Sequence, residues 1–254
     1  MPNSIADKTF ALFENPGSKK IVAELENAGA RIIKFPVIEA EKVILNEASK
    51  KILNNLQNFD WVIFPDVLTV DFFLQILEEN AIDFFELDEM RVCACGEIVS
   101  DRLRFVQLHA DVIPQTIEPE DVLSALKNYI GEEEFVSLKF LCLKEISSQN
   151  AIETELAVNA QISELGIYQI KTPNGNEIAK LKTLLKGGAI DEFIFYAPTD
   201  FIWLKHIFND EPLDHILSGI KVSAVNGVIF QTIREHNLKQ AGLFQRGKID
   251  TVDE

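Results

Sequence analysis

The fold of this chain is decided by two stretches, Asp60-Trp61-Val62-Ile63-Phe64-Pro65 and Asp191-Glu192-Phe193-Ile194-Phe195-Tyr196-Ala197-Pro198. Each is an apolar run that ends at a proline and leads into a helical stretch, and a second apolar run follows, at 92–96 and at 222–227. The interval from Phe64 to Val92 is 28 residues and that from Phe195 to Val222 is 27, so the spacing repeats as well. One strand–helix–strand unit in each half predicts two similar lobes with a ligand-binding cleft between them.

The composition is typical of a soluble globular protein. With 254 residues, the chain is long enough for two modest domains, each with its own core. Hydrophobic residues make up 47% and charged residues 25%, and no apolar run approaches the ~20 residues that span a bilayer. The N-terminus lacks the basic segment and apolar stretch of a secretory signal. We therefore expect a cytoplasmic protein without a membrane partner.

The charge and the cysteine pattern exclude several classes of function. A net charge of −16 argues against nucleic acid as a partner, because phosphate binding relies on basic patches. Cys93, Cys95 and Cys142 do not have zinc-like spacing with histidine, and the four histidines are scattered. We expect buried, reduced thiols and no metal.

Helical and extended segments alternate along the chain. Strands are expected at 9–13, 31–38, 140–143, 192–196 and 220–225, and helices at 47–57, 67–80, 97–108, 120–130, 175–186, 199–208 and 228–236. A further helix is expected from about 150 to 166, before an extended segment at 167–171. This order predicts an α/β fold of doubly wound, flavodoxin-like lobes, each a parallel sheet covered on both faces. Ligands should then lie at the carboxyl ends of the strands.

Two short extended segments, at 35–38 and 167–172, are candidates for strands that cross between the lobes. Two crossing strands mean that one domain is inserted into the other. Tyr168 lies on the second of these segments and should face the cleft. A lone tyrosine in an extended segment more often packs than reacts, so both roles stay open.

The turns that end the repeated strands are candidate anion sites. A helix N-terminus offers backbone N–H groups and the positive end of a dipole, so it binds a carboxylate without a basic side chain. Asp66 and Thr199 are expected to cap two of these helices. Every parallel sheet needs such turns, so a purely structural role also remains open. Neither a GxGxxG pattern nor a P-loop supports a nucleotide.

The order of elements over roughly residues 8 to 240 resembles the uroporphyrinogen-III synthase family. That family has a Thr-Arg-Pro-like first turn, and in each half a strand ending in Phe-Thr-Ser and a Gly-x-x-Thr-Ala turn. It also has a tyrosine after the helix of the inserted domain. The matching positions here are Leu12-Phe13-Glu14-Asn15-Pro16, Phe64-Pro65-Asp66, Phe195-Tyr196-Ala197-Pro198, Gly96-Glu97-Ile98-Val99-Ser100, Asn226-Gly227-Val228-Ile229-Phe230 and Tyr168.

The resemblance implies a domain plan and a reaction. One lobe would comprise 1–35 and 173–254 and the other 39–167, joined by crossover strands at 36–38 and 168–172. Linear hydroxymethylbilane would lose water and close to uroporphyrinogen III with ring D inverted, without a cofactor. The partner would be this polycarboxylate tetrapyrrole, and we expect a monomer. Tyr168 would be the catalytic proton donor. Substrate would be bound by Pro65, Asp66, Gly96, Glu97, Ile98, Ser147, Ser148, Ala197, Pro198, Thr199, Gly227, Val228 and Ile229.

Several polar positions of the family pattern are exchanged in this chain. Asn15 replaces the arginine of the first turn, and Val99 and Ile229 replace threonines. Asp66 and Glu97 would repel a polycarboxylate, at a cost on the order of a kcal/mol each in a partly desolvated site. Two alternatives therefore stand beside the enzyme: a family member that has lost catalysis and serves as a binding or regulatory protein, and a generic two-lobed small-molecule binding protein.

Overall fold

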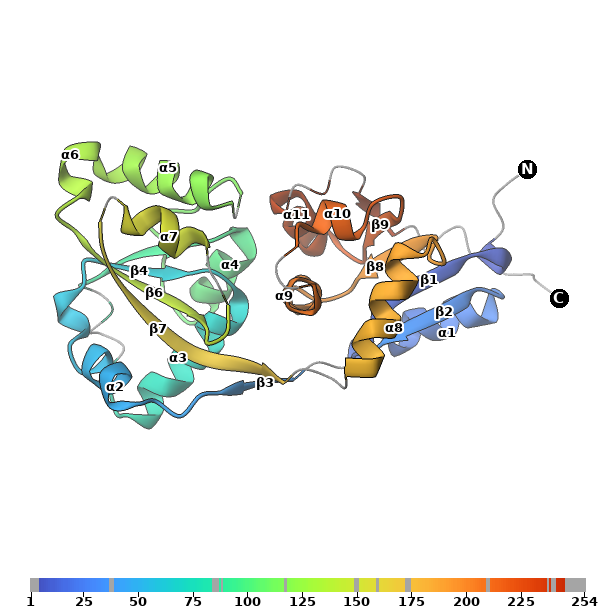
Figure 1. Cartoon of the computed structure of the whole chain (residues 1–254), viewed down its shortest axis with the longest axis horizontal. Helices are drawn as coiled ribbons and strands as arrows, with labels where there is room; N and C mark the ends of the chain where they lie inside the picture. The colour runs from blue at the N-terminus through green and yellow to red at the C-terminus, as the bar shows by residue number, and fades with distance from the viewer. Residues whose placement is uncertain are drawn as a thin grey trace. The chain divides into compact units, whose positions relative to one another are not determined.

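A computed structural model describes this chain at residues 5–36, 39–83, 87, 89–116, 118–148, 151–158, 160–171, 175–208, 211–236, 238 and 241–244 (Figure 1). The chain divides into two compact units. Unit 1 comprises Met1–Glu39 and Thr172–Glu254, and unit 2 comprises Ala40–Lys171. The two ends of the chain therefore build one unit, and the middle builds the other.

Unit 1 contains a sheet in the order β10-β9-β8-β1-β2. Its strands are β1 (Thr9–Phe13), β2 (Arg31–Phe35), β8 (Glu192–Phe195), β9 (Lys221–Ala224) and β10 (Ala241–Leu243), and neighbouring strands pair in parallel. The helices are α1 (Lys19–Asn27), α8 (Gly175–Lys186), α9 (Thr199–Ile207), α10 (Leu213–Ile216) and α11 (Gly227–Glu235), with 3-10 turns at Ile5–Asp7 and Pro16–Ser18. Counted along the chain, the strand order is that of flavodoxin-like folds, and its switch point lies between β1 and β8.

Unit 2 contains a sheet in the order β3-β7-β6-β4-β5. Its strands are β3 (Glu39–Lys42), β4 (Trp61–Phe64), β5 (Arg91–Ala94), β6 (Lys139–Glu145) and β7 (Gln161–Lys171). The helices are α2 (Glu47–Leu53), α3 (Val67–Glu79), α4 (Glu97–Phe105), α5 (Pro119–Ile130), α6 (Glu132–Phe135) and α7 (Ala151–Ala157), with a 3-10 turn at Leu56–Asn58. The strands β5, β4, β6 and β7 are parallel and repeat the order of unit 1, so the switch point here lies between β4 and β6.

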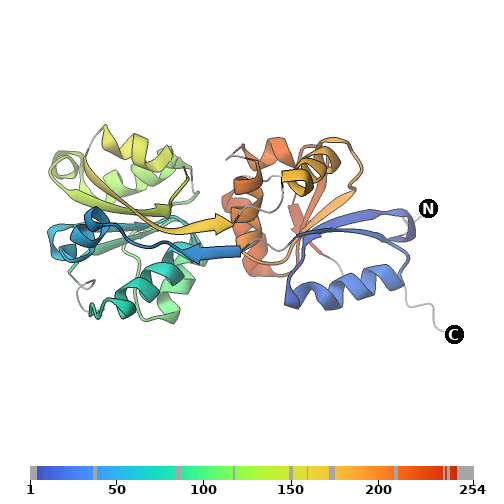
Figure 2. The same cartoon turned by 60° about the horizontal axis from the view of Figure 1, so that its bottom comes forward.

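The edge strand β3 runs against β7 in the opposite direction (Figure 2, blue and yellow arrows). The Val43 N–H donates to the Ile167 carbonyl at 3.2 Å, and the Glu41 carboxylate accepts from the Gln169 amide at 2.7 Å. Of the expected crossover segments, 37–38 and 172 lie outside the described residues. Residues 168–171 form the end of β7.

Each face of the unit 2 sheet has its own apolar core. Val62, Phe64, Leu141 and Leu143 pack with residues of α3, and on the other face Trp61, Ile63 and Phe140 pack with residues of α5 and α7. Because both faces are buried, β4 and residues 140–143 of β6 are continuous apolar runs rather than alternating ones. The predicted α/β class with covered parallel sheets is confirmed.

One expectation about the elements is wrong. The helix expected to end by Gly166 is α7, which stops at Ala157, and Gln161–Lys171 is the long strand β7. This strand pairs with β6 from Lys139↔Gln161 onward and buries Leu165 and Ile167. Pairing and burial outweigh the helical pattern of the isolated segment.

A β-bulge in this pairing determines where Tyr168 points. Lys144 pairs with Gly166 and Glu145 pairs with Tyr168, so β7 carries one extra residue, Ile167. Consecutive residues of a regular strand point to opposite faces of the sheet. At the bulge, Ile167 and Tyr168 both join the core on the α3 side, because a bulge redirects side chains.

We expect Phe73→Ala in α3 to lower the free energy of unfolding of unit 2 by about 3–5 kcal/mol, because it leaves a cavity in the core. Phe73 is 0% exposed, and its ring centre lies 5.8 Å from that of Phe64. Trp61 lies in unit 2 and Trp203 in unit 1, so a Trp203→Phe background lets urea unfolding report unit 2 alone. The control Phe105→Ala removes a ring that is 81% exposed and should change little. Equal losses from both variants would contradict this packing.

Candidate functional site

Three polar side chains stand in one row at the switch point of unit 2. The β4–β6 register pairs Ile63 with Cys142, and continued for three residues it places Asp66 level with Glu145. The β6–β7 register then pairs Glu145 with Tyr168. The row therefore crosses three neighbouring strands at their carboxyl ends, where doubly wound sheets bind ligands.

Asp66 joins helix α3 to Tyr168. It is the N-cap of α3: its Oδ1 accepts from the Thr69 N–H at 2.8 Å, and the Asp66 N–H donates to the Thr69 hydroxyl at 3.4 Å. Its other oxygen, Oδ2, accepts from the Tyr168 hydroxyl at 3.0 Å. The cap predicted at Asp66 is thus confirmed, and it fixes the carboxylate beside the tyrosine.

The environment of Asp66 keeps its carboxyl close to half protonated in mildly acidic solution. Burial raises the pKa of Asp66 to about 6, and the negative charge of Glu145 acts in the same direction. Hydrogen bonds from the Thr69 and Leu68 backbone and from Tyr168 oppose the rise in pKa. A carboxyl group with this pKa can exchange a proton near neutral pH.

Tyr168 is a core residue. The side chain is 1% exposed, and its ring stacks on Phe72 of α3 with centres 5.4 Å apart. The expectation that Tyr168 faces an open cleft is therefore wrong within unit 2. The bulge and the stack with Phe72 turn the ring inward, so that the hydroxyl reaches Asp66.

Glu145, which the sequence analysis missed, completes the row. It is 6% exposed, and its carboxylate accepts from the Ser147 N–H at 2.8 Å and from the Ser147 hydroxyl at 2.7 and 2.8 Å. Ser147 lies in a turn and not at a helix start, since α7 begins at Ala151. The Ser148 N–H donates to the Glu145 carbonyl at 3.2 Å. Ser147 thus holds Glu145, which occupies the serine N–H expected to bind substrate.

The start of α4 is built differently. Its N-cap is Gly96, whose φ of 105° favours glycine. No side chain caps this helix start. Glu97 forms an ion pair with Arg104 at 3.3 Å, which offsets part of the repulsion expected from Glu97. Ile98 is partly buried and packs against the core on the α3 side.

At the switch point of unit 1, a buried carboxylate occupies the turn after β8. Asp200 is 1% exposed, and its Oδ2 accepts from the N–H groups of Tyr196 at 2.7 Å and Ala197 at 3.0 Å. Burial raises the pKa of Asp200 to about 6, and the hydrogen bonds from these two N–H groups limit the rise. The cap expected at Thr199 is wrong: Pro198 is the N-cap, without a side-chain bond, because Asp200 closes the turn.

The start of α11 is capped by the side chain of its N-cap residue. Asn226 Oδ1 accepts from the Ile229 N–H at 2.9 Å, and the Ile229 side chain is buried, whereas Gly227 and Val228 are exposed. Backbone N–H groups at the starts of α3 and α11, and in the turn before α9, therefore bind side chains of this chain. The expectation that these helix starts present open backbone amides to an anion does not hold for those N–H groups.

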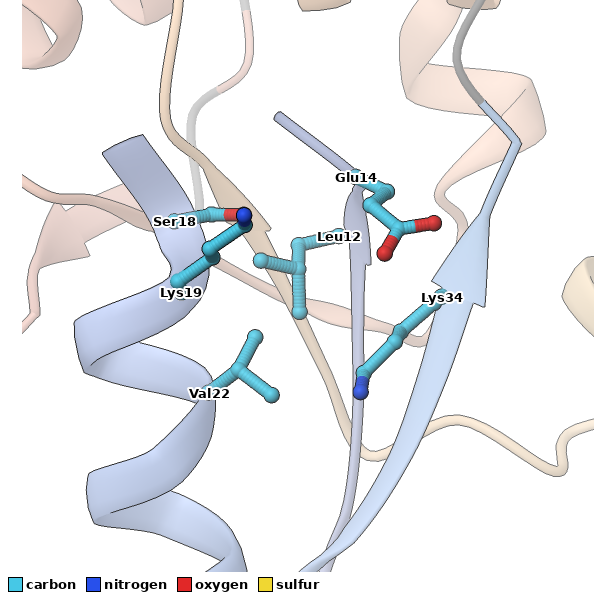
Figure 3. A pocket seen from close by; sticks show the side chains of 6 residues that line it. All are labelled: Leu12, Glu14, Ser18, Lys19, Val22 and Lys34. Carbon is cyan, nitrogen blue, oxygen red and sulfur yellow. The ribbon is translucent and has the colours of Figure 1, made fainter. Parts of the chain in front are cut away.

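A small hollow that opens to solvent lies between α1, β1 and β2 (Figure 3). Leu12 and Val22 form its apolar floor, and Lys19 and Lys34 come from different elements to its edge. Its other lining residues are Glu14 and Ser18. Nothing in the sequence pattern marks these lysines, because only the fold brings them together.

Among the described residues, no three side chains of the metal-binding types come together. Within the same residues, no helix has the length and apolar character to cross a membrane. The three cysteines are buried and do not form disulfides.

The model of the family described as uroporphyrinogen-III synthase HemD matches residues 19–246, a span that runs through both units. The chain belongs to the uroporphyrinogen-III synthase family. A curated relative, the porphyrin biosynthesis protein HemD of Ruminiclostridium josui, is 21% identical over 170 residues, which are 67% of this chain. The chain spans about a third of the length of that relative, because the match covers 33% of it.

Solved structures of uroporphyrinogen III synthase from Thermus thermophilus share the fold. One has a TM-score of 0.62 and 18% identity, with 96% of each chain covered. Another, of the wild-type enzyme, has a TM-score of 0.63 and 17% identity, covering 96% of this chain and 95% of that one. Where the family pattern has hydroxyl residues after the first strand of the repeat, this chain has Pro65 and Asp66. An aspartate can cap a helix as serine or threonine does, so the exchange keeps the cap and adds a titratable group.

We expect Asp200→Asn to remove a pH dependence from the stability of unit 1. Because the folded-state pKa of about 6 is above the unfolded value, Asp200 makes the fold less stable as pH rises from about 4 to 6. Both N–H groups bond to one oxygen, which asparagine retains, so the variant should gain on the order of 2 kcal/mol at pH 7 and nothing near pH 4. Urea unfolding followed by Trp203 fluorescence in a Trp61→Phe background measures this. The exposed Asp214, changed to Asn, is the control, and parallel pH curves for wild type and Asp200→Asn would contradict the assignment.

Proposed function

We propose that this protein is a uroporphyrinogen-III synthase, a cofactor-independent lyase of tetrapyrrole (haem) biosynthesis. It closes linear hydroxymethylbilane to uroporphyrinogen III with inversion of ring D. The observation that carries the proposal is the family match, which extends through both units and includes the switch point of unit 2. The row of Asp66, Glu145 and Tyr168 at one switch point provides a group that can assist the first chemical step.

The reaction needs one proton and a great deal of positioning. The terminal hydroxyl of the substrate leaves as water, and the resulting azafulvene attacks the substituted position of ring D. A spiro intermediate then rearranges, and closure gives the macrocycle. Holding a flexible chain in the closing conformation is catalysis by orientation. Protonation of the departing hydroxyl is general acid catalysis, which typically gives about 10²–10⁴-fold.

Tyr168 is the proposed proton donor, and Asp66 controls its proton. When Asp66 is ionised, the Tyr168 hydroxyl donates to it. When Asp66 is protonated, the carboxyl O–H can donate to the phenol oxygen, and the hydrogen of Tyr168 can point to the substrate. Protonated Asp66 also carries no charge to repel a polycarboxylate.

Substrate carboxylates need local positive charge in a chain with a net charge of −16. Lys19 at the hollow of unit 1 supports binding of such groups, and Lys34 beside it forms an ion pair with Glu26 at 3.2 Å. Of the predicted binding residues, we retain those that are at least partly exposed and leave out Gly96 and Ile229, which are buried, and Ser147, which holds Glu145. The retained residues are Pro65, Asp66, Glu97, Ile98, Ser148, Ala197, Pro198, Thr199, Gly227 and Val228.

We further propose that the protein acts as a monomer in the cytoplasm on this small molecule. A net charge of −16 disfavours nucleic acid as a partner.

A family member without catalysis is the second candidate, and Asn15 favours it. In place of the family's arginine, Asn15 caps the 3-10 turn at Pro16–Ser18: its Oδ1 accepts from the Ser18 N–H at 2.8 Å. Its Nδ2 is buried without a partner among the described residues. This position therefore supplies no positive charge to a substrate.

The isomer ratio formed from freshly generated hydroxymethylbilane tests the proposal. Spontaneous closure yields the type I macrocycle, so each assay contains its own background. Predominant type III product from purified protein supports the synthase. Type I product alone from a folded sample overturns it, and binding of uroporphyrin by that sample would favour the second candidate.

We expect Tyr168→Phe to lower kcat for type III product by about 10²-fold or more, because the proton donor is lost. The ring and its stack with Phe72 remain, so KM should change less than threefold. Tyr129, which is 48% exposed on α5, provides the control Tyr129→Phe, with no expected effect. A fall in kcat for Tyr168→Phe no larger than that of the control, or a matching rise in KM, would indicate a packing role instead.

A further inference from the structure

Glu145 is a buried acid for which the proposed reaction has no direct use. It ends β6 between Asp66 and Tyr168 in the row, and its hydrogen-bond donors among the described residues all belong to Ser147. Its neighbour Lys144 pairs across the sheet with Glu164 at 2.9 Å. A carboxylate at this depth is costly unless something stabilises its charged form.

Ser147 provides that stabilisation. The serine N–H and hydroxyl reach both carboxylate oxygens, at 2.7–2.8 Å. Donors directed at a carboxylate favour its charged form. Glu145 is therefore a negative charge in a fixed place, held by a residue two positions further along its own chain.

This charge acts on Asp66. The nearness of Glu145 adds to burial in raising the pKa of Asp66. Of the other charges on the elements packed around Asp66, Asp71 of α3 pairs with Arg102 of α4, and Glu97 and Asp101 pair with Arg104 within α4. Glu79, at the far end of α3, pairs with Lys42 of β3, and Glu78 beside it carries a further negative charge. Tyr168 of β7 and the α3 backbone contribute hydrogen bonds that lower the pKa of Asp66.

We propose that Glu145, held by Ser147, is a positioning residue whose fixed charge keeps a proton on Asp66 and so leaves the Tyr168 hydrogen available to the substrate. This inference rests on the proposed function. Tyr168 gives its proton to the departing hydroxyl, which leaves as water, and takes the Asp66 proton in its place. The substrate releases one proton when the macrocycle closes, and this proton restores Asp66.

The test is Glu145→Gln, read in two independent ways. Aspartate-selective ¹³C labelling, with the Asp66 signal assigned by its loss in Asp66→Asn, follows the titration of Asp66 without any substrate. We expect the titration midpoint to fall in Glu145→Gln, because the neighbouring charge is gone. The descending limb of kcat against pH should move by the same amount toward lower pH, which lowers kcat at pH 7.

Glu164→Gln is the matched control, because it removes a glutamate charge from the neighbouring strand, where the side chain is exposed. It should leave both readings unchanged. An unchanged Asp66 titration in Glu145→Gln overturns the inference whether or not the protein is a synthase. A shifted titration with an unmoved kcat profile also overturns it. Wild-type protein that forms no type III product contradicts the proposed function itself, and the titration result does not depend on that.

Discussion

The hydrogen bond between the Tyr168 hydroxyl and the Asp66 carboxylate is the contact on which the site depends. Each partner is placed by a different part of the fold. The α3 N-cap holds Asp66, and the β-bulge between β6 and β7 turns Tyr168 toward it. Both devices stand at the carboxyl ends of strands beside the switch point, so the fold itself brings a phenol and a carboxyl group of raised pKa together.

Each unit holds an aspartate beside a helix start, and the two aspartates bond to the backbone differently. Each aspartate lies at the turn after the first strand of the repeat, and burial raises the pKa of both to about 6. Asp66 caps α3 from the N-cap position, whereas Asp200 reaches back from the second residue of α9 to the preceding turn. In both places a resident carboxylate takes backbone N–H groups that could bind an anion. Under the proposed function, recognition of a polycarboxylate must then use other groups, of which Lys19 is an example.

Much of the fold could be predicted from the sequence because the deciding signals are local. The repeated apolar runs identify β4 and β8, one of the two strands at each switch point, and helix α8 begins and ends where its pattern predicts. The helix cap at Asp66 was also predictable, because an aspartate before an apolar helix is a strong cap signal.

The site was harder to predict from the sequence because it depends on the register of the paired strands. Tyr168 faces inward only because Ile167 is an extra residue in β7, and no local pattern announces that bulge. Glu145 gave a weak signal, an acid just after the apolar run 140–143, but its place between Asp66 and Tyr168 follows from the pairing of three strands. Asp200 was not predicted because the N–H groups that it binds, those of Tyr196 and Ala197, precede it in the chain. A cap at Thr199 was the simpler expectation.

A double-mutant cycle on the rate of type III product formation tests the central claim most directly, that Asp66 acts through Tyr168. The variants are Asp66→Asn, Tyr168→Phe and the pair together, measured at pH 6 and compared as free energies. The account predicts that Asp66→Asn changes the rate of the wild type but not that of Tyr168→Phe, with a coupling free energy of about 1 kcal/mol or more. Effects that add to within about 0.5 kcal/mol would contradict it, because the two residues would then act independently.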